Sequence, residues 1–302
     1  MISKETEMDK ILNLDTPERY CELYGLQCYN PQVCVVDLHD SEISVDSVTN
    51  FGFYAMFLKL EKCEITYGRT VYDNDDGTLV SIGPGQVCRC VAPEGRRPKC
   101  TALLFDKKLI QGTRLGKNID KYSFFSYSSN EALHMSEDEM KIVLDCMEKI
   151  RIESENDTDG HSRDIIVMGI ELLLEYCMRF YDRQFTSRAK LDKDILTQFE
   201  SLLNEYFRDD NQSRYGLPTV KYFADKICLS SGYFGDLVKK MTGRTAQDII
   251  LDKIADLSKE LLLGTDKSVS EVAYTLGFEY PQHFTRFFKK RTGQTPQEYR
   301  GA

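Results

Sequence analysis

Residues 281–300 read PQHFTRFFKKRTGQTPQEYR, and fifty positions earlier residues 231–250 read SGYFGDLVKKMTGRTAQDII. The two stretches share a Phe, a Lys-Lys pair, a Thr-Gly pair, a Thr and a Gln in the same order. Upstream, Val220 and Ala224 match Val269 and Ala273 at an offset of 49 residues. Chance seldom places nine such identities within about 30 positions, so the C-terminal part contains two copies of one supersecondary unit.

Each copy predicts a helix, a tight turn and a second helix. In the second copy Ser268 and Glu271 have the spacing of a capping box, Gly277 supplies a left-handed turn residue, and Pro281 suits the first position of the next helix. In the first copy Cys228 takes the position of the glycine. That replacement is compatible with the same turn if the backbone at Cys228 is not strongly left-handed.

A helix is also predicted between the two copies, from Ala246 to Leu263, because apolar residues recur there at helical spacing. A helix of this length spans on the order of 27 Å. Such a connector suits two recognition helices that enter successive major grooves, which are ~34 Å apart on one face of DNA.

The tail resembles the DNA-binding domain of the AraC/XylS family. The likeness is carried by residues 268–278, 283–290 and 293–300, and it extends over about residues 215–300. Over residues 30–106 there is a general likeness to the cupin-like regulatory domain of that family. The resemblance implies a sequence-specific DNA-binding transcription regulator with two helix-turn-helix units, and it leaves open whether the protein is an activator or a repressor.

In the second recognition helix Phe284, Phe287 and Phe288 have core-facing spacing, which leaves other side chains for DNA. The predicted contacts there are Pro281, Gln282, Thr285, Arg286, Lys289 and Lys290. Gln can pair with adenine and Arg with guanine edges. Lys290 and Arg291 are interpreted as phosphate contacts or as simple surface charges.

The first recognition helix offers Ser231, Gly232, Gly235, Lys239 and Lys240 as predicted DNA contacts. Its small residues and Asp236 make it a weaker base reader, since Asp236 repels phosphate. Two readings stay open: the second copy carries most of the direct readout, or the glycines allow unusually close approach of the backbone to DNA.

The chain is predicted to be an α+β multidomain protein. Short β-branched and aromatic runs separated by turn signals predict an N-terminal antiparallel β-barrel (cupin-like), or a sandwich, with accompanying helices. These runs are residues 33–38, 51–60, 64–71, 78–82 and 100–105. The predicted parts are a regulatory domain over residues 1–135, a helical dimerisation segment over 136–208, a linker over 209–217 and an all-α tandem helix-turn-helix domain over 218–302.

The middle segment shows helical patterns after Ser136, whose spacing to Glu139 is that of a capping box. The pattern over residues 164–181 is apolar nearly all round, so that helix must be covered on more than one side. A third pattern covers residues 191–207. Part of this surface is interpreted as a homodimer interface, with packing against the chain's own strands as the alternative.

Charge and cysteine usage limit the partners and the chemistry. The net charge is −9, but residues 212–302 carry +4 and the remainder −13, which is compatible with a DNA-binding tail on an acidic body. The ten cysteines are scattered, without a CxxC pair, and His39 stands alone in the barrel stretch. We therefore expect no metal site, no cofactor and no catalytic residues.

The N-terminal part has candidate ligand-binding aromatics, Tyr54, Phe57, Tyr67 and Tyr72, for which core packing is the competing interpretation. The expected partners are double-stranded DNA, a small-molecule effector, a second copy of the chain and RNA polymerase. Two alternatives remain: a ligand-independent regulator whose acidic body recruits a protein partner, and an enzyme or ligand-storage module that bears a DNA-binding tail. No apolar run suits a membrane span or a secretory signal, which predicts a cytoplasmic protein.

Overall fold

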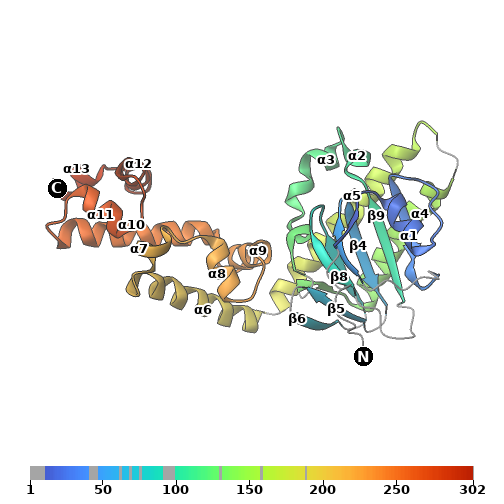
Figure 1. Cartoon of the computed structure of the whole chain (residues 1–302), viewed down its shortest axis with the longest axis horizontal. Coiled ribbons are helices and arrows are strands. Elements are labelled where there is room, and N and C mark those ends of the chain that lie inside the picture. Colours follow the sequence, from blue (N-terminus) through green and yellow to red (C-terminus); the bar gives the residue numbers. More distant parts are fainter. Residues whose placement is uncertain are drawn as a thin grey trace, which may run out of the picture. The chain divides into compact units, whose positions relative to one another are not determined.

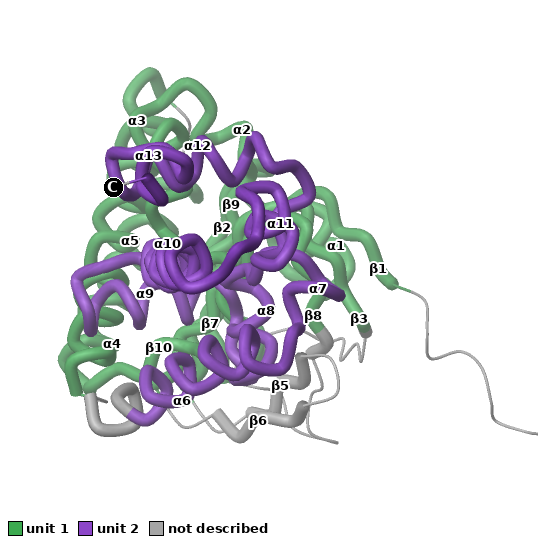
Figure 2. The backbone as a smooth tube through the Cα atoms, turned by 90° about the vertical axis from the view of Figure 1, so that its left-hand side faces the viewer, with its two compact units in different colours: residues 1–187 green, residues 188–302 purple. Residues whose placement is uncertain are grey.

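The chain folds into two compact units, residues 1–187 and residues 188–302, coloured green and purple in Figure 2. The structure is a computed structural model. It describes residues 11–40, 47–60, 63–67, 70–74, 77–90, 99–128, 131–156, 159–187 and 189–301. The helices and strands are labelled in Figure 1.

The first unit contains two sheets and the helices around them. Its strands are β1 (Leu12–Leu14), β2 (Val33–Asp37), β3 (Ser47–Phe51), β4 (Tyr54–Lys59), β5 (Cys63–Tyr67), β6 (Thr70–Asn74), β7 (Thr78–Ile82), β8 (Val87–Cys90), β9 (Cys100–Phe105) and β10 (Leu133–His134). Its helices are α1 (Pro17–Tyr24), α2 (Lys107–Ile110), α3 (Arg114–Asn118), α4 (Glu137–Glu155) and α5 (Ser162–Ser187), with 3₁₀ turns η1 (Leu38–Asp40), η2 (Ile119–Lys121) and η3 (Ser123–Ser126).

The strands form two five-stranded sheets, in the orders β1-β3-β8-β5-β6 and β10-β7-β4-β9-β2. Within the described residues no backbone pairing joins the two sheets, so the predicted closed barrel is not observed. The end strands of the second sheet lie against helices instead of against the other sheet: β2 contacts α4, and β10 contacts α5. β1 also departs from the prediction, because it pairs with β3 in parallel.

The predicted strand over residues 64–71 is wrong, because two strands occupy this region. β5 and β6 pair antiparallel with Tyr67 opposite Thr70, so the chain reverses between them. The predicted strands over residues 78–82 and 100–105 are confirmed with these bounds. They flank β4, with Phe57 opposite Val80 on one side and Ala102 on the other.

The helices α4 and α5 confirm the helical patterns predicted after Ser136. The capping box is formed: the Ser136 hydroxyl accepts the Glu139 N–H, and the Glu139 carboxylate accepts the Ser136 N–H at 2.9 Å. The Arg151 guanidinium of α4 donates to Asp37 of β2 at 2.8 Å. This bond and the packing of α4 on α5 attach the helical pair to the second sheet.

The second unit is all helical. Its helices are α6 (Ala189–Arg208), α7 (Asn211–Tyr215), α8 (Val220–Lys226), α9 (Ser231–Thr242), α10 (Ala246–Gly264), α11 (Val269–Thr275), α12 (Pro281–Thr292) and α13 (Pro296–Gly301). In Figure 1, α10 extends from α8 and α9 at one end of the unit to α11, α12 and α13 at the other, in agreement with its contacts.

The boundary between the units differs from the predicted one. Phe199, Leu203 and Tyr206 of α6 are buried in the same core as residues of α8 to α12, so α6 belongs to the second unit. The predicted linker over residues 209–217 contains the short helix α7. The Tyr206 hydroxyl donates to the Gly216 carbonyl at 3.0 Å, which ties this segment to α6.

Among the helices that the structure describes, none combines the length and apolar character needed to cross a bilayer.

Candidate nucleic-acid interface

The two helix-turn-helix copies agree in their hydrogen bonds. At the end of α9 the Thr242 hydroxyl lies 2.8 Å from the Val238 carbonyl and 3.1 Å from that of Arg244. At the end of α12 the Thr292 hydroxyl has the corresponding distances, 2.8 Å to Phe288 and 3.1 Å to Gln294. The glycine that follows each threonine is left-handed, and the next threonine caps the following helix. The sequence repeat is therefore a repeat of local structure.

The turn of the second copy has the predicted elements. Ser268 and Glu271 form the capping box of α11, and Gly277 has a φ of +90°. After it the Phe278 N–H donates to the Ala273 carbonyl at 3.0 Å, which closes the turn. A Cβ at Gly277 would lie 2.9 Å from the carbonyl carbon of Gly216, so both the dihedral angle and the close approach require glycine.

The first copy builds the same turn with a cysteine. The Leu229 N–H donates to the Ala224 carbonyl at 2.9 Å, as in the second copy, but the φ of Cys228 is +61°. The condition that the backbone here is not strongly left-handed is therefore not met. A side chain in this conformation costs roughly 1–2 kcal/mol.

The second recognition helix, α12, separates a buried face from an exposed one. Phe284 and Phe288 are fully buried, while Phe287 is half-buried against Phe278. The exposed side chains of the predicted set are Gln282, Arg286, Lys289 and Lys290, whereas Pro281 and Thr285 are half-buried. The Thr285 hydroxyl donates to the Pro281 carbonyl at 3.1 Å, which leaves its oxygen able to accept.

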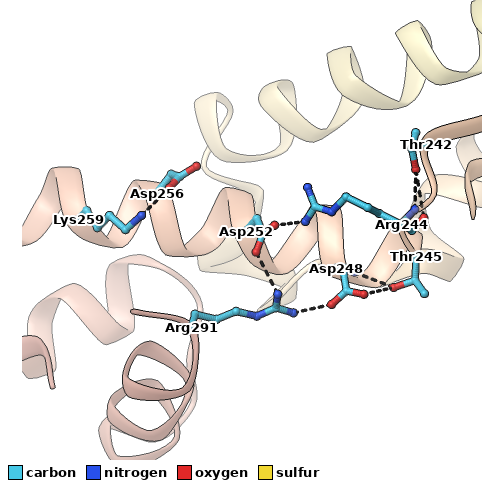
Figure 3. A network of polar contacts seen from close by, with 8 residues as sticks. All are labelled: Thr242, Arg244, Thr245, Asp248, Asp252, Asp256, Lys259 and Arg291. Carbon is cyan, nitrogen blue, oxygen red and sulfur yellow. Dashed lines mark hydrogen bonds and ion pairs between the residues drawn. The ribbon is translucent and has the colours of Figure 1, made fainter. Parts of the chain in front are cut away.

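Arg291, the last cation of α12, is bound by carboxylates of α10. Its guanidinium donates to Asp248 at 2.8 Å and to Asp252 at 3.0 Å, both on α10 (Figure 3). Arg244, just after α9, forms an ion pair with the second carboxylate oxygen of Asp252. Asp252 thus bridges the two copies through the connecting helix, and Arg291 is part of the scaffold.

Charge and hydrogen bonds stabilise the ionised form of this network. Hydrogen bonds from the Thr245 hydroxyl and the Arg291 guanidinium lower the pKa of Asp248. Neither Arg244 nor the two aspartates were singled out from the sequence. The helical spacing of Asp248 and Asp252, four residues apart on α10, is the signal that places both on one face.

The first recognition helix, α9, presents smaller groups. Ser231 is exposed, Gly232, Gly235 and Asp236 are half-buried, and Lys239 and Lys240 are exposed. A Cβ at Gly235 would meet nothing within 4 Å. Packing within the unit therefore does not require a glycine at this position.

The ligand-binding candidates of the first unit do not form one pocket. Residues three apart in a strand point to opposite faces, and Tyr54 and Phe57 do so. Tyr54 stacks on Phe105 at 5.0 Å between ring centroids, whereas Phe57 packs in the other aromatic core beside Tyr20. The side chains of Tyr67 and Tyr72 lie outside the described part of the structure.

Three cysteines that look scattered in the sequence converge in the first unit. Cys21, Cys28 and Cys34 have Sγ atoms within 4.8 Å of one another. The Cys21 and Cys34 sulfurs are 3.4 Å apart. Hydrogen bonds with Cys21 and Cys34 lower the pKa of Cys28, whereas hydrogen bonds with Cys21 and Cys28, together with burial, raise the pKa of Cys34. The sequence interpretation missed this group because no short motif joins the three residues.

Comparison with known proteins places the strongest likeness in the second unit. Residues 223–302 match a family described as a helix-turn-helix domain. YobQ of Bacillus subtilis, named as an HTH-type transcriptional regulator, is 33% identical over 82 residues, which cover 27% of this chain and 34% of that protein. This chain therefore spans about a third of the length of that relative.

Another relative extends the likeness beyond this unit. YijO of Escherichia coli, also named as an HTH-type transcriptional regulator, is 24% identical over 233 residues, which cover 75% of this chain and 76% of that protein. Among solved structures, the C-terminal domain of the response regulator yesN from Fusobacterium nucleatum has 33% sequence identity to this chain. The match covers 33% of this chain and 96% of the solved one, with a TM-score of 0.30.

Proposed function

From residues 223–302, which form an AraC-type helix-turn-helix domain, we propose that this chain is a sequence-specific regulator of transcription that binds duplex DNA through α9 and α12. YobQ and YijO are named as transcriptional regulators, and the proposal assigns the chain no catalytic role. The acidic first unit is the regulatory part of this proposal.

The observation that carries the proposal is that some polar side chains of α12 are exposed while Arg291 is bound within the unit. Gln282, Arg286 and Lys289 are exposed, while Arg291 is held by two carboxylates of α10. If this helix face were only solvated, nothing would require Arg291, its last cation, to be bound by α10. The arrangement supports base reading by Gln282 and Arg286, with phosphate contacts from Lys289 and Lys290.

The two copies are proposed to act unequally. α12 has the long polar side chains that pair with base edges in the major groove. α9 has Gly232 and Asp236 at the positions that correspond to Gln282 and Arg286, so it positions the protein through its backbone and through Lys239 and Lys240. Two weak contacts that are joined by α10 gain effective concentration for each other.

We also infer that the chain forms a homodimer through α5. Ile165, Met168 and Leu172 are 46%, 60% and 48% exposed, and their spacing places them on one face of the helix. The helix is otherwise buried against its own unit through residues such as Ile170 and Leu174. Exposed apolar rows of this kind mark association sites, and a two-fold pairing of the same face covers both copies.

The first unit is proposed to receive the signal, and RNA polymerase is proposed as the partner of the DNA-bound protein. If the first unit responds to a small molecule, that ligand should change the DNA affinity of the full chain. If it only recruits a protein, calorimetric screening against metabolites should find no ligand while DNA binding persists.

The test is selection of bound fragments from a random duplex library with the full chain at fixed salt, since salt dominates such affinities. The proposal expects one enriched sequence with a strongly specified half for α12 and a weakly specified half for α9. Recovery of unenriched sequences, with affinity that depends on length alone, would refute sequence-specific binding.

A further inference from the structure

The cysteine triad Cys21, Cys28 and Cys34 belongs to one local motif. Cys21 lies on α1, Cys34 on β2, and Cys28 on the loop that joins them. Cys21 and Cys34 are buried, whereas Cys28 is half-buried and so gives the triad an approach from solvent. No element of the proposed DNA-binding function uses these three thiols.

Hydrogen bonds of the backbone hold the loop that carries Cys28. Gly25 ends α1 in a left-handed conformation, and the Leu26 N–H donates to the Cys21 carbonyl at 2.9 Å. Farther along, the Gln32 N–H donates to the Asn30 side chain at 3.0 Å, and the Cys28 thiol donates to the Asn30 carbonyl at 3.2 Å. The sulfurs are therefore brought together by an ordered turn.

The triad has the donor geometry of a three-coordinate sulfur site. A central atom about 2.3 Å from each sulfur requires sulfurs roughly 3.4 Å apart if it is pyramidal and roughly 4 Å apart if it is planar. The observed sulfurs, one pair at 3.4 Å and all within 4.8 Å, need to move by less than about 1 Å. Among the described residues the group contains no fourth His, Cys, Asp or Glu ligand.

The apolar surroundings of the sulfurs determine which charge a bound atom must carry. The two buried sulfurs lie in the aromatic core that contains Tyr20, Phe53 and Phe57. Three thiolates carry three negative charges, and uncompensated charge in an apolar core is strongly unfavourable. A monovalent or divalent ion leaves the site negative, whereas a trivalent centre makes it neutral. Sulfur ligands further select a soft, thiophilic element.

We propose that Cys21, Cys28 and Cys34 form a trithiolate site for a trivalent metalloid of the arsenite class. In the binding step three arsenic–oxygen bonds of arsenous acid break and three arsenic–sulfur bonds form. Each thiol proton leaves with one hydroxide as water, so three waters are released and no atom changes oxidation state. Cys28, as the half-buried thiol of the three, is the first to exchange.

If the chain is a regulator, a metalloid bound here is its effector, and this part of the proposal rests on the proposed function. Binding would draw α1, its loop and β2 together around one atom. Because β2 pairs with β9 and contacts α4, the change acts on the second sheet and the helical pair that bears the exposed row of α5.

The experiment titrates the reduced full chain with sodium arsenite and follows it by native mass spectrometry and calorimetry. The expected result is one arsenic per chain, with a mass gain of one arsenic atom less three hydrogens. Cys28→Ser should weaken binding by more than the roughly 10- to 100-fold that follows loss of an outer-shell partner, since it removes a direct ligand. Circular dichroism and the melting temperature verify that this variant folds.

Cys228→Ser is the matched control, because Cys228 is an exposed cysteine of the other unit, and it should bind arsenite as the parent does. Equal uptake by Cys28→Ser, no uptake at all, or tighter binding of Zn²⁺ than of arsenite would overturn the proposal. Oxidation to a Cys21–Cys34 disulfide is a further check. If the chain is then reduced and still does not bind arsenite, the proposal is overturned as well.

Binding to duplex DNA is measured separately, with and without arsenite. A chain that binds DNA but not arsenite leaves the regulator proposal intact and removes the metalloid site. A chain that binds arsenite but not DNA leaves the metalloid site intact and removes the regulator proposal.

Discussion

The guanidinium of Arg291 bonds two carboxylates of α10, Asp248 at 2.8 Å and Asp252 at 3.0 Å. Asp252 also pairs with Arg244 of the first copy, so one aspartate is shared by cations from both helix-turn-helix copies. The burial of Phe284 and Phe288 in the common core attaches α12 to the unit, and these ion pairs set its orientation around α10. The spacing of α9 and α12, the helices proposed to contact DNA, is therefore a property of this cluster as well as of the length of α10.

Arg291→Met should separate a scaffold role from a phosphate contact. The side chains of Arg291, Asp248 and Asp252 are 24%, 46% and 40% exposed, so solvent screens both pairs and their loss should lower the free energy of unfolding only slightly. The salt dependence of DNA affinity should keep its slope. Lys290→Met is the control, and its slope should fall by about one, as for a lost phosphate contact. A slope that falls by one in Arg291→Met would contradict the scaffold role.

Arg286→Ala should remove one base contact. We expect a loss of about 1–3 kcal/mol on the selected site and relaxed preference at one base pair. Competition binding against single base-pair variants of the site measures both effects. Equal weakening on selected and unrelated DNA would make Arg286 a phosphate contact.

The left-handed position in the two turns gives opposite predictions for the two copies. Cys228→Gly removes a side chain from a φ of +61° and should raise the unfolding free energy by about 0.5–1 kcal/mol after the greater flexibility of unfolded glycine is allowed for. Gly277→Ala adds a Cβ at a φ of +90° and within 3.0 Å of Gln212 and Gly216, which should cost at least about 2 kcal/mol. Denaturant unfolding monitors both variants, and loss of stability in Cys228→Gly would show that the cysteine side chain packs favourably.

The helix-turn-helix unit was predictable because its signals are local. A capping box, a left-handed glycine and a helix-starting proline each act within a few residues, and Ser268, Gly277 and Pro281 occupy those roles in the structure. The repeat doubled each signal. Cys228 shows the limit of such local signals, because the turn imposes a left-handed backbone on a residue type that disfavours it.

Features that depend on long-range packing were not predictable in the same way. The periodicity of α6 reveals an apolar face but not its partner, which is the second unit. The strand patterns could not distinguish two sheets from a closed barrel, because closure depends on which edge strands pair. The aromatics Tyr54 and Phe57 are close in sequence yet on opposite faces of β4, and the cysteine triad exists only because α1 and β2 meet through a loop.

Met168→Glu should dissociate the proposed dimer. It places a charge in the centre of the exposed row of α5, where a second copy would bury it without a partner. Analytical ultracentrifugation should show a monomer, and affinity for a two-site operator should fall while affinity for a single site persists. Leu263→Glu, the same kind of change at an exposed residue of the other unit, is the control. A monomeric parent chain, or a Met168→Glu dimer, would refute the α5 interface.

Gly235→Ala should make the protein more stable and its DNA complex weaker. Glycine within a helix costs up to ~1 kcal/mol relative to alanine, and the open space around a Cβ at Gly235 means that alanine meets no steric obstacle in the free protein. If α9 lies with its backbone close to DNA, that same methyl group must separate the two surfaces, so we expect roughly tenfold lower affinity, about 1.4 kcal/mol. Gly264→Ala on α10, which also has open space, is the control for a general effect of glycine replacement. Unchanged affinity in Gly235→Ala together with a gain in stability would leave Lys239 and Lys240 as the whole contribution of α9, because no close approach would then remain to be blocked.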